Sequence, residues 1–451
     1  MLNLSNMDVH NKVVNAFAPE ISICPRCGAW SPRNEIRSRY YWEANLHHVS
    51  VTEVRAGCYL CPDCPPGEQW FTLLPADFRT KRQYTVLSHQ ILVDIVKKHR
   101  MSVEEAAAFG RNILHLEKLD ATTLLEWVRN AGETVDTSTR MKESVEAFSG
   151  EMALDEVYDA GWYQLKATDP LNGIDLAWKL ERGNPSEDDV RSFLLELKAN
   201  GFEPQLVVTD GSLLYPAVIA EVWPGARHQR CVFHFIKQVN SDLGKTFWKA
   251  YNSLPKPPKR TRGRPKRRGR PRTDNLKKEN RCKVKKARFL FLKRDSRLTD
   301  KERKVLDEAI ELCSPLGTLR SFVVKLHELF GPSTRTAEIA EERRQAILAN
   351  PEFTALESLS KAVNRLRDND LFIRLTRYLD FEDADKTSNH VERENREFRN
   401  RQKSHYRMRS PRSLRALLDL LLVRRPVPQQ PRKLRKKAGG VTITEEVRQA
   451  A

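Results

Sequence analysis

Residues 152–222 carry the succession of hydrophobic patterns that most constrains the fold of this chain. Three apolar runs are followed by an amphipathic helix capped by Ser186 and closed by Asn200-Gly201, then by a short apolar run and a second helix. The predicted elements occupy, in chain order, residues 152–157, 161–168, 174–181, 186–197, 206–209 and 213–222. The first three strands predict an antiparallel meander, and the whole order predicts an α/β domain.

Two aspartates lie on the strands of this domain. Asp155 interrupts the first apolar strand, and Asp210 directly follows the fourth. The order of elements matches a ribonuclease H-like core, in which the first and fourth strands are neighbours, so we expect the two carboxylates to meet. The alternative, that both are solvated turn acids, fits Asp155 poorly, because an unpaired carboxylate within an apolar strand is costly unless a cation or a donor compensates it.

A third acid, Glu392, lies on a charged helix that we expect from Asn389 to Asn400, with a second helix at residues 414–423 behind it. Phosphoryl transfer on a nucleic acid uses two divalent cations about 4 Å apart, held by carboxylates. The three acids together predict a site of this kind. Glu394 is a competitor for the third position, but residues two apart on a helix point about 200° apart, so both cannot face the same metals.

The net charge of the chain points to a polyanionic partner. Lys and Arg number 78 against 59 Asp and Glu, a formal charge of +19, and residues 251–300 alone hold 20 basic and 4 acidic side chains. No apolar run approaches the roughly 20 residues of a membrane span, and the N-terminus lacks the pattern of a secretory signal. We therefore expect a polyanionic partner, no membrane, and a cytoplasmic location in a bacterium or a nuclear one in a eukaryote. Double-stranded DNA as that partner, and a nucleoid-associated location in a bacterium, are what the AT-hook-like repeats and the family resemblance described below imply.

Paired cysteines near the N-terminus predict a zinc site. The motifs Cys24-Pro-Arg-Cys27 and Cys61-Pro-Asp-Cys64 are two Cys-Pro-x-Cys knuckles, the usual way to present four thiolates to Zn²⁺. Cys58 leaves the ligand set ambiguous, because Cys58 and Cys61 also have Cys-x-x-Cys spacing. The alternative is a chance cluster of buried thiols. Disulfides are not expected in a reducing compartment.

Residues 84–130 predict three helices. Apolar residues recur at three- and four-residue spacing from Leu87, Ser102 caps a small-residue run, and a third helix starts near Asp120. Short helices of this kind suggest a helix-turn-helix that reads the ends of a DNA element. An ordinary three-helix packing module remains the alternative, because no basic recognition face stands out.

Prolines and basic residues fill residues 253–272 and predict a linker. Within it an Arg-Gly-Arg-Pro sequence occurs twice, and the core residues are Arg262, Gly263, Arg264, Arg268, Gly269 and Arg270. Extended arginines of this kind enter the narrow minor groove of A·T-rich DNA, and the repeat resembles the AT-hook. A nuclear-localisation signal or a nonspecific basic linker is the alternative.

These features divide the chain into segments. The expected segments are a zinc ribbon at 1–75, a helical DNA-binding module at 76–148, a ribonuclease H-like catalytic core at 149–250 and 381–424, a basic linker with AT-hook-like repeats and an α-helical insertion at 251–380, and a basic tail at 425–451. We expect the tail, which includes residues 432–440, to be disordered and to add affinity for phosphates.

Residues 209–234 and 387–395 resemble the DDE transposases, closest to the Mutator-like group and the related bacterial insertion-sequence families. Beyond the second acid, Pro224, Ala226, Gln229, Cys231 and His234 have the spacing Pro-x-Ala-x-x-Gln-x-Cys-x-x-His, which resembles the signature of the family. The segment around the last acid is similar as well.

The resemblance implies a catalytic triad of Asp155, Asp210 and Glu392 that holds Mg²⁺ or Mn²⁺. It also implies that Cys231 and His234, with Asn395, lie near that site. Alternatively, Cys231 and His234 are one buried thiol and one core histidine, because two ligands alone make an incomplete zinc site. The AT-hook-like cores depart from the usual pattern of the family.

Together these features predict a DNA transposase that hydrolyses a phosphodiester at the ends of its element and joins the freed 3′-hydroxyl to target DNA, acting as a homodimer or higher oligomer. A domesticated DNA-binding regulator with an inactive or repurposed core is the main alternative. The intact Asn-x-x-Glu-x-x-Asn context of Glu392 argues against decay. A ribonuclease or resolvase is a third possibility, which the AT-hook-like cores disfavour because RNA lacks a narrow A·T-rich minor groove.

Overall fold

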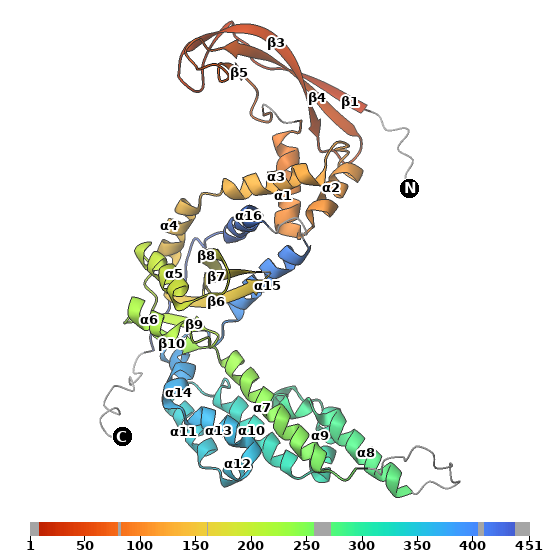
Figure 1. Ribbon diagram of the computed structural model, residues 1–451, viewed down its shortest axis with the longest axis vertical. Helices are drawn as coiled ribbons and strands as arrows, with labels where there is room; N and C mark the ends of the chain where they lie inside the picture. The colour runs from red at the N-terminus through yellow and green to blue at the C-terminus, as the bar shows by residue number, and fades with distance from the viewer. Residues whose placement is uncertain (1–8, 80–82, 160, 257–271, 405–409, 438–451) are drawn as a thin grey trace. The chain divides into compact units, whose positions relative to one another are not determined.

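The computed structural model describes residues 9–79, 83–159, 161–256, 272–404 and 410–437 (Figure 1). The chain divides into two compact units. Unit 1 comprises Met1–Arg140 and Glu394–Pro426, and unit 2 comprises Met141–Arg393 and Val427–Ala451. We describe each unit by itself.

Unit 1 begins with a five-stranded sheet built on a long antiparallel hairpin. Its strands are β1 (Val9–Asn15), β2 (Ile21–Ile23), β3 (Trp30–Glu43), β4 (Val49–Leu60) and β5 (Trp70–Thr72). Their order is β1-β4-β3-β2, with β5 paired to β4. Tyr59 and Phe71 stack beside the cysteines at one end, and Tyr41 packs on Phe78 at the other. Two small cores of this kind bury little apolar surface, so the sheet depends on a further stabilising element.

Four helices follow the sheet, at α1 (Val86–His99), α2 (Val103–Asn112), α3 (Ala121–Glu133) and α4 (Thr137–Ala147). Their starts follow from the sequence. Thr85 and Asp120 cap α1 and α3, and Ser102 forms a capping box with Glu105 at the start of α2. The helices expected between residues 84 and 130 are therefore present.

Helix α16 (Pro411–Leu422) packs against α3 in unit 1. Gly132 makes this close approach available, since a Cβ there would lie 2.4 Å from the Ala416 carbonyl oxygen. Arg412 donates hydrogen bonds to Glu126 and Glu133 beside it. Residues 381–424, the segment expected to complete the catalytic core, are divided between the two units, with the part from Glu394 onward in unit 1. There α3 covers the apolar face of α16.

Unit 2 contains a mixed five-stranded sheet in the order β10-β9-β6-β7-β8. The strands are β6 (Glu151–Asp159), β7 (Trp162–Asp169), β8 (Ile174–Arg182), β9 (Leu206–Thr209) and β10 (Arg227–Arg230). The strands β6, β7 and β8 form an antiparallel meander, while β9 runs parallel to β6 and β10 parallel to β9. This mixed α/β sheet is consistent with the expected ribonuclease H-like core.

The two faces of the sheet are covered by different elements. Helices α5 (Glu187–Ala199) and α6 (Pro216–Val222) share a core with Met152, Leu154 and Val207. On the opposite face, Ala153 and Val208 share a smaller core with Val391 of α15 (Asn389–Ser404). Alternating residues of β6 and β9 therefore face α5 and α6 on one side and the start of α15 on the other.

The described residues between β10 and α15 are mainly helical. A 22-residue helix, α7 (Val232–Ser253), leads out of the sheet. The elements beyond the linker are α8 (Arg272–Ala287), α9 (Asp300–Leu312), α10 (Pro315–Leu329), α11 (Ala337–Leu348), α12 (Pro351–Ala355), α13 (Ser360–Arg367) and α14 (Asn369–Thr376). These helices share one large apolar core with α7 (Figure 1). The helical part of the expected insertion is thus a packed body with its own core.

The expectation of a disordered basic tail is wrong for residues 432–437. Leu434 is buried with Ala153 and Val391, and its N–H donates to the Ser149 carbonyl oxygen at 2.8 Å. Lys433 donates to the carbonyl oxygen of Phe148, and Lys436 pairs with Phe381 in a β-bridge. One apolar residue and backbone hydrogen bonds hold this segment in place. Its basic composition therefore did not reveal that it is ordered. Residues 438–451 lie outside the described residues.

Candidate active site

Asp155 lies on β6, and Asp210 directly follows β9, the parallel neighbour of β6. The register of β6 and β9 pairs Ala153 with Val208, and two residues further along each strand come Asp155 and Asp210. In a parallel pair, residues in register point to the same face of the sheet. Asp155 therefore lies on the sheet face that the start of α15 covers, and Asp210 follows the end of β9 at the same level, where the chain leaves the sheet.

A tight turn fixes the Asp210 carboxylate. Its Oδ1 atom accepts hydrogen bonds from the backbone N–H groups of Gly211 and Ser212, the latter at 2.7 Å. Gly211 has a φ of +147°, and a Cβ there would lie 2.7 Å from the Arg230 Nε atom. Glycine is therefore required both by the backbone conformation and by the guanidinium that packs over the turn.

Glu392 lies in the first turn of α15 and is held by side chains from two elements. The Ser388 hydroxyl donates to Glu392 Oε1 at 2.9 Å, and His234 Nδ1 lies 3.6 Å from the same oxygen. Ser388 also donates its backbone N–H to Cys231 Sγ at 3.3 Å. The sequence Cys231-x-x-His234 at the start of α7 thus meets the start of α15.

The other acids of α15 have different partners. Glu394 is buried and forms ion pairs with Arg424 at 3.0 Å and Arg425 at 2.6 Å. Asn395 is also buried. Glu392 and Glu394 therefore differ in environment as the helical period requires, one beside His234 and one enclosed by arginines.

Glu156, which the sequence reasoning did not single out, lies on the opposite face from Asp155. Its Oε2 atom accepts a hydrogen bond from the Tyr215 hydroxyl. Burial raises the pKa of Glu156, and the charge of Asp210 adds to this. Burial also raises the pKa of Tyr215 well above its ordinary value, and the charges of Glu156, Asp155 and Asp210 act in the same direction. Because successive residues of a strand point to opposite faces of the sheet, the sequence alone could have assigned Glu156 and Asp155 to different faces.

Cys231 and His234 interact directly. A hydrogen bond with Cys231 raises the pKa of His234, and the charge of Glu392 contributes in the same direction. Burial opposes ionisation of Cys231, but hydrogen bonds from His234 and Ser388 outweigh it and lower the pKa of the thiol. The pair is therefore more than an isolated thiol and histidine.

The donor atoms form two chemically distinct sets. Asp155 and Asp210 offer carboxylate oxygens, the ligands that Mg²⁺ and Mn²⁺ prefer, and Glu392 offers a third carboxylate. Cys231, His234 and Glu392 have donor atoms within 4.8 Å of one another, whereas among the described residues the three proposed catalytic acids do not form such a group. The carboxylates fit hard divalent cations, and Glu392 lies at the junction with the Cys-His pair.

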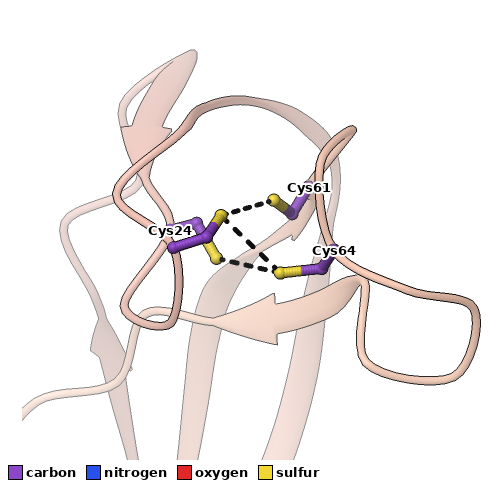
Figure 2. Close-up of side chains that lie close together, drawn as sticks. Cys24, Cys61 and Cys64 are labelled. Atoms are coloured by element: carbon purple, nitrogen blue, oxygen red, sulfur yellow. Dashed lines mark hydrogen bonds between the residues drawn. The ribbon is translucent and has the colours of Figure 1, made fainter.

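Four cysteines of unit 1 form a cluster with the dimensions of a zinc site (Figure 2). The Sγ atoms of Cys24 and Cys64 are 3.7 Å apart, and those of Cys27 and Cys61 are 3.4 Å apart. A tetrahedron of thiolates about 2.3 Å from zinc has edges of about 3.8 Å, so the cluster fits the ion. The Sγ atom of Cys58 instead lies 3.3 Å from the Thr72 hydroxyl, on β4 and outside the cluster.

The AT-hook-like repeats and strand β10 are the two features that remain to be placed. The AT-hook-like residues 262–270 lie outside the described residues. Strand β10 escaped sequence reasoning because its residues Arg227–Arg230 are polar. Its central Gln229 is buried, donates to the Leu375 carbonyl oxygen at 3.1 Å and accepts from the Tyr378 N–H at 2.9 Å. In the sequence, the only indication of a further strand was the length of chain between Asp210 and Cys231.

In the part of the chain that the structure describes, no helix combines the length and the apolar character needed to cross a membrane. No curated protein matches the chain. Among solved structures, the Drosophila P element transposase strand transfer complex is similar over 78% of this chain and 93% of that chain, with 13% sequence identity and a TM-score of 0.39. A likeness at this level supports no conclusion about the site.

The decisive comparison is with a family of sequences. A family model described as a transposase, DDE_Tnp_ISL3, matches residues 179–418, which is more than half of the chain. The matched region begins on β8 and includes Asp210, the Cys231–His234 pair and Glu392. The chain therefore belongs to this transposase family and is a DNA transposase.

Proposed function

We propose that the chain cleaves a phosphodiester at each end of its element and transfers the freed strand into target DNA, with Asp155, Asp210 and Glu392 as the metal-binding residues. The observation that supports the proposal is the parallel register of β6 and β9, because Asp155 and Asp210 each come two residues after the last paired residues, Ala153 and Val208. Kinship with the Mutator-like group and a bacterial host belong to the same proposal.

Each acid has a distinct role in this proposal. Bound divalent cations, Mg²⁺ or Mn²⁺, would supply activation of the attacking oxygen and stabilisation of the leaving oxygen. Asp155 and Asp210 bind cations from the sheet, and the turn at Gly211 and Ser212 fixes the Asp210 carboxylate before any ligand arrives. Ser388 orients Glu392 from its own helix turn.

Hydrolysis at the element's end breaks the bond between phosphorus and the 3′-oxygen and leaves a 3′-hydroxyl. In strand transfer that hydroxyl displaces another 3′-oxygen at the target, so one phosphodiester is exchanged for another without an energy source. A single set of carboxylates serves both reactions, because both place negative charge on oxygens at one phosphate.

The other segments recognise DNA. The cysteine cluster holds Zn²⁺ and stabilises a zinc-ribbon-like sheet, and helices α1 to α3 contact the element's ends as a helix-turn-helix-like module. The two Arg-Gly-Arg-Pro cores add contacts in A·T-rich minor grooves. We further propose that the protein acts as a homodimer or higher oligomer, because two ends must be cut and joined together.

Purified Asp155→Asn and Asp210→Asn variants test the proposal on a duplex that carries the inverted repeat flanking the coding region. Both should bind this duplex as the wild-type protein does and should not cleave it in Mg²⁺, since the amide keeps the shape but not the charge. Glu156→Gln is the matched control, because it removes a neighbouring carboxylate from the opposite face. Cleavage by Asp155→Asn together with loss of cleavage by Glu156→Gln would contradict the proposal, because it would place the catalytic site on the face of β6 that carries Glu156.

A further inference from the structure

A basic groove lies in unit 2 at the edge of the sheet formed by β10. Its volume is about 780 Å³, and it is bordered by α6, the segment leading into β10, and α14. The charged side chains that line it are Arg227, Arg374, Arg377, Lys436 and Asp370. Four cations therefore face a single anion across the groove.

The cations of this groove are poorly compensated. Arg227 and Arg377 share one carboxylate, that of Asp380, at 3.4 and 3.7 Å. Arg374 donates to the backbone carbonyl oxygen of Asp370 and makes no side-chain ion pair within the described residues. Positive charge held close together in this way is stabilised when a polyanion binds.

The effect of this positive field is visible on neighbouring groups. Burial lowers the pKa of His228 to about 4, and the charges of Arg374 and Arg230 act in the same direction. Burial likewise lowers the pKa of Arg377, and Arg227 adds to the effect. Burial is the larger cause of both shifts, and the neighbouring guanidinium groups add to it because they repel further positive charge.

The groove is connected to the catalytic face by one short path. The His228 Nε2 atom lies 2.9 Å from the Thr209 hydroxyl oxygen, and Thr209 directly precedes Asp210. Strand β10 pairs with β9 through Arg230 and Thr209. The groove and Asp210 are therefore separated only by the end of β9 and its pairing with β10 at the edge of the sheet.

We propose that this groove binds the phosphate backbone of a DNA strand that continues from the phosphodiester at Asp155 and Asp210. The assignment to a strand next to the scissile phosphate rests on the proposed catalytic site, whereas phosphate binding rests on the groove alone. Arginines that contact phosphates fix the register of a strand without reading its sequence. Arg374 and Arg377 are positioning residues here, because they contact the DNA strand at a distance from the reacting atoms.

Salt dependence of DNA affinity tests the proposal without relying on catalysis. We compare Arg374→Gln/Arg377→Gln with Lys301→Gln/Lys304→Gln, which removes the same charge from exposed positions on α9. Each phosphate contact contributes about −0.9 to the slope of log K against log salt for duplex DNA. The groove variant should flatten the slope by about 1 to 2, and the control should flatten it less. An equal change in both variants, or none, overturns the proposal.

Four further measurements keep the result interpretable. A charge-preserving Arg374→Lys/Arg377→Lys variant should restore most of the slope, and a thermal midpoint close to wild type excludes misfolding of the glutamine variant. In Mg²⁺ the groove variant should raise KM more than it lowers kcat. Inorganic phosphate, added at constant ionic strength and at a concentration comparable to that of the DNA phosphates, should leave the difference in DNA binding between groove variant and wild type unchanged. If the groove variant loses phosphate binding but keeps the wild-type DNA slope, the groove is a small-anion site and the proposal fails.

Discussion

Replacing Glu392 or Glu394 by Gln should separate catalysis from stability on one helix. The two substitutions are chemically identical, but the carboxylates have different surroundings. The Glu394 side chain is 4% exposed and is paired with Arg424, which is 20% exposed, and Arg425, which is 44% exposed. Glu392 is partly exposed and accepts its hydrogen bond from the Ser388 hydroxyl, which an amide oxygen can also accept.

The expected magnitudes follow from these contacts. Breaking a buried ion pair costs about 3–5 kcal/mol, but Arg424 keeps Glu397 at 3.1 Å and Arg425 is nearly half exposed. We therefore expect Glu394→Gln to destabilise unit 1 by about 2 kcal/mol, or about 4–8 °C in thermal midpoint. Glu392→Gln should change stability by less than about 1 kcal/mol yet lower cleavage at least about 100-fold, because a cation ligand supplies several kcal/mol in the transition state.

The assay measures thermal unfolding and then cleavage of the end duplex well below the lower midpoint. At that temperature Glu394→Gln is folded and should cleave at close to the wild-type rate. If Glu394→Gln abolishes cleavage while its unfolding is unchanged, and Glu392→Gln cleaves normally, the reasoning about the face of α15 is refuted.

Three other predictions follow from buried or clustered groups. Burial, with the charges of Asp385 and Asp169, raises the pKa of Glu151 to about 8. The stability linked to its proton is present below about pH 4.5 and is lost as the pH rises toward 8. The free energy of unfolding, measured with urea, should therefore fall over this range by a few kcal/mol (~1.4 per pH unit) more in wild type than in Glu151→Gln, and parallel pH profiles would contradict this. Elemental analysis should find zinc in wild type and in Cys58→Ser but not in Cys64→Ser, whose N-terminal sheet should unfold; wild type without zinc would refute the site. Alanine at the four arginines of residues 262–270 should weaken binding to A·T-rich more than to G·C-rich duplexes and spare cleavage of a bound end, whereas equal losses would indicate a plain electrostatic tether.

Hydrophobic periodicity was sufficient to predict the strands that carry the aspartates. The expected strand at residues 152–157 is β6 (Glu151–Asp159), and the strand at 206–209 matches β9 (Leu206–Thr209), because buried strands must be apolar to pack on both faces. The cysteine pairs were equally informative, since their spacing alone placed four thiols together.

Contacts between distant segments could not be predicted. The apolar face of α16 indicates burial but not its partner, and its contact with α3 depends on the absence of a Cβ atom at Gly132. Strand β10 is polar and is held by hydrogen bonds of Gln229 to a segment about 150 residues away in sequence. The role of Leu434 as an anchor was hidden among basic residues for the same reason.

The candidate site shows the same limit. Residue type and motif predicted which acids to consider, but the partners that fix them come from the fold. Ser388 and His234 meet Glu392 only because α7 and α15 begin beside each other. The pairing of Glu394 with Arg424 depends on residues beyond the helix, so only the structure separates the two acids.

Metal preference in cysteine variants tests the central claim, that Asp155 and Asp210 bind the catalytic cations, most directly. A thiolate is a poor ligand for Mg²⁺ and a better one for Mn²⁺, which binds softer donors more readily. Asp155→Cys and Asp210→Cys should therefore fail to cleave in Mg²⁺ and recover part of the wild-type cleavage in Mn²⁺, while Glu156→Cys cleaves similarly in both metals. Wild-type cleavage in Mg²⁺ by either aspartate variant, or an equal loss in both metals, would contradict the account.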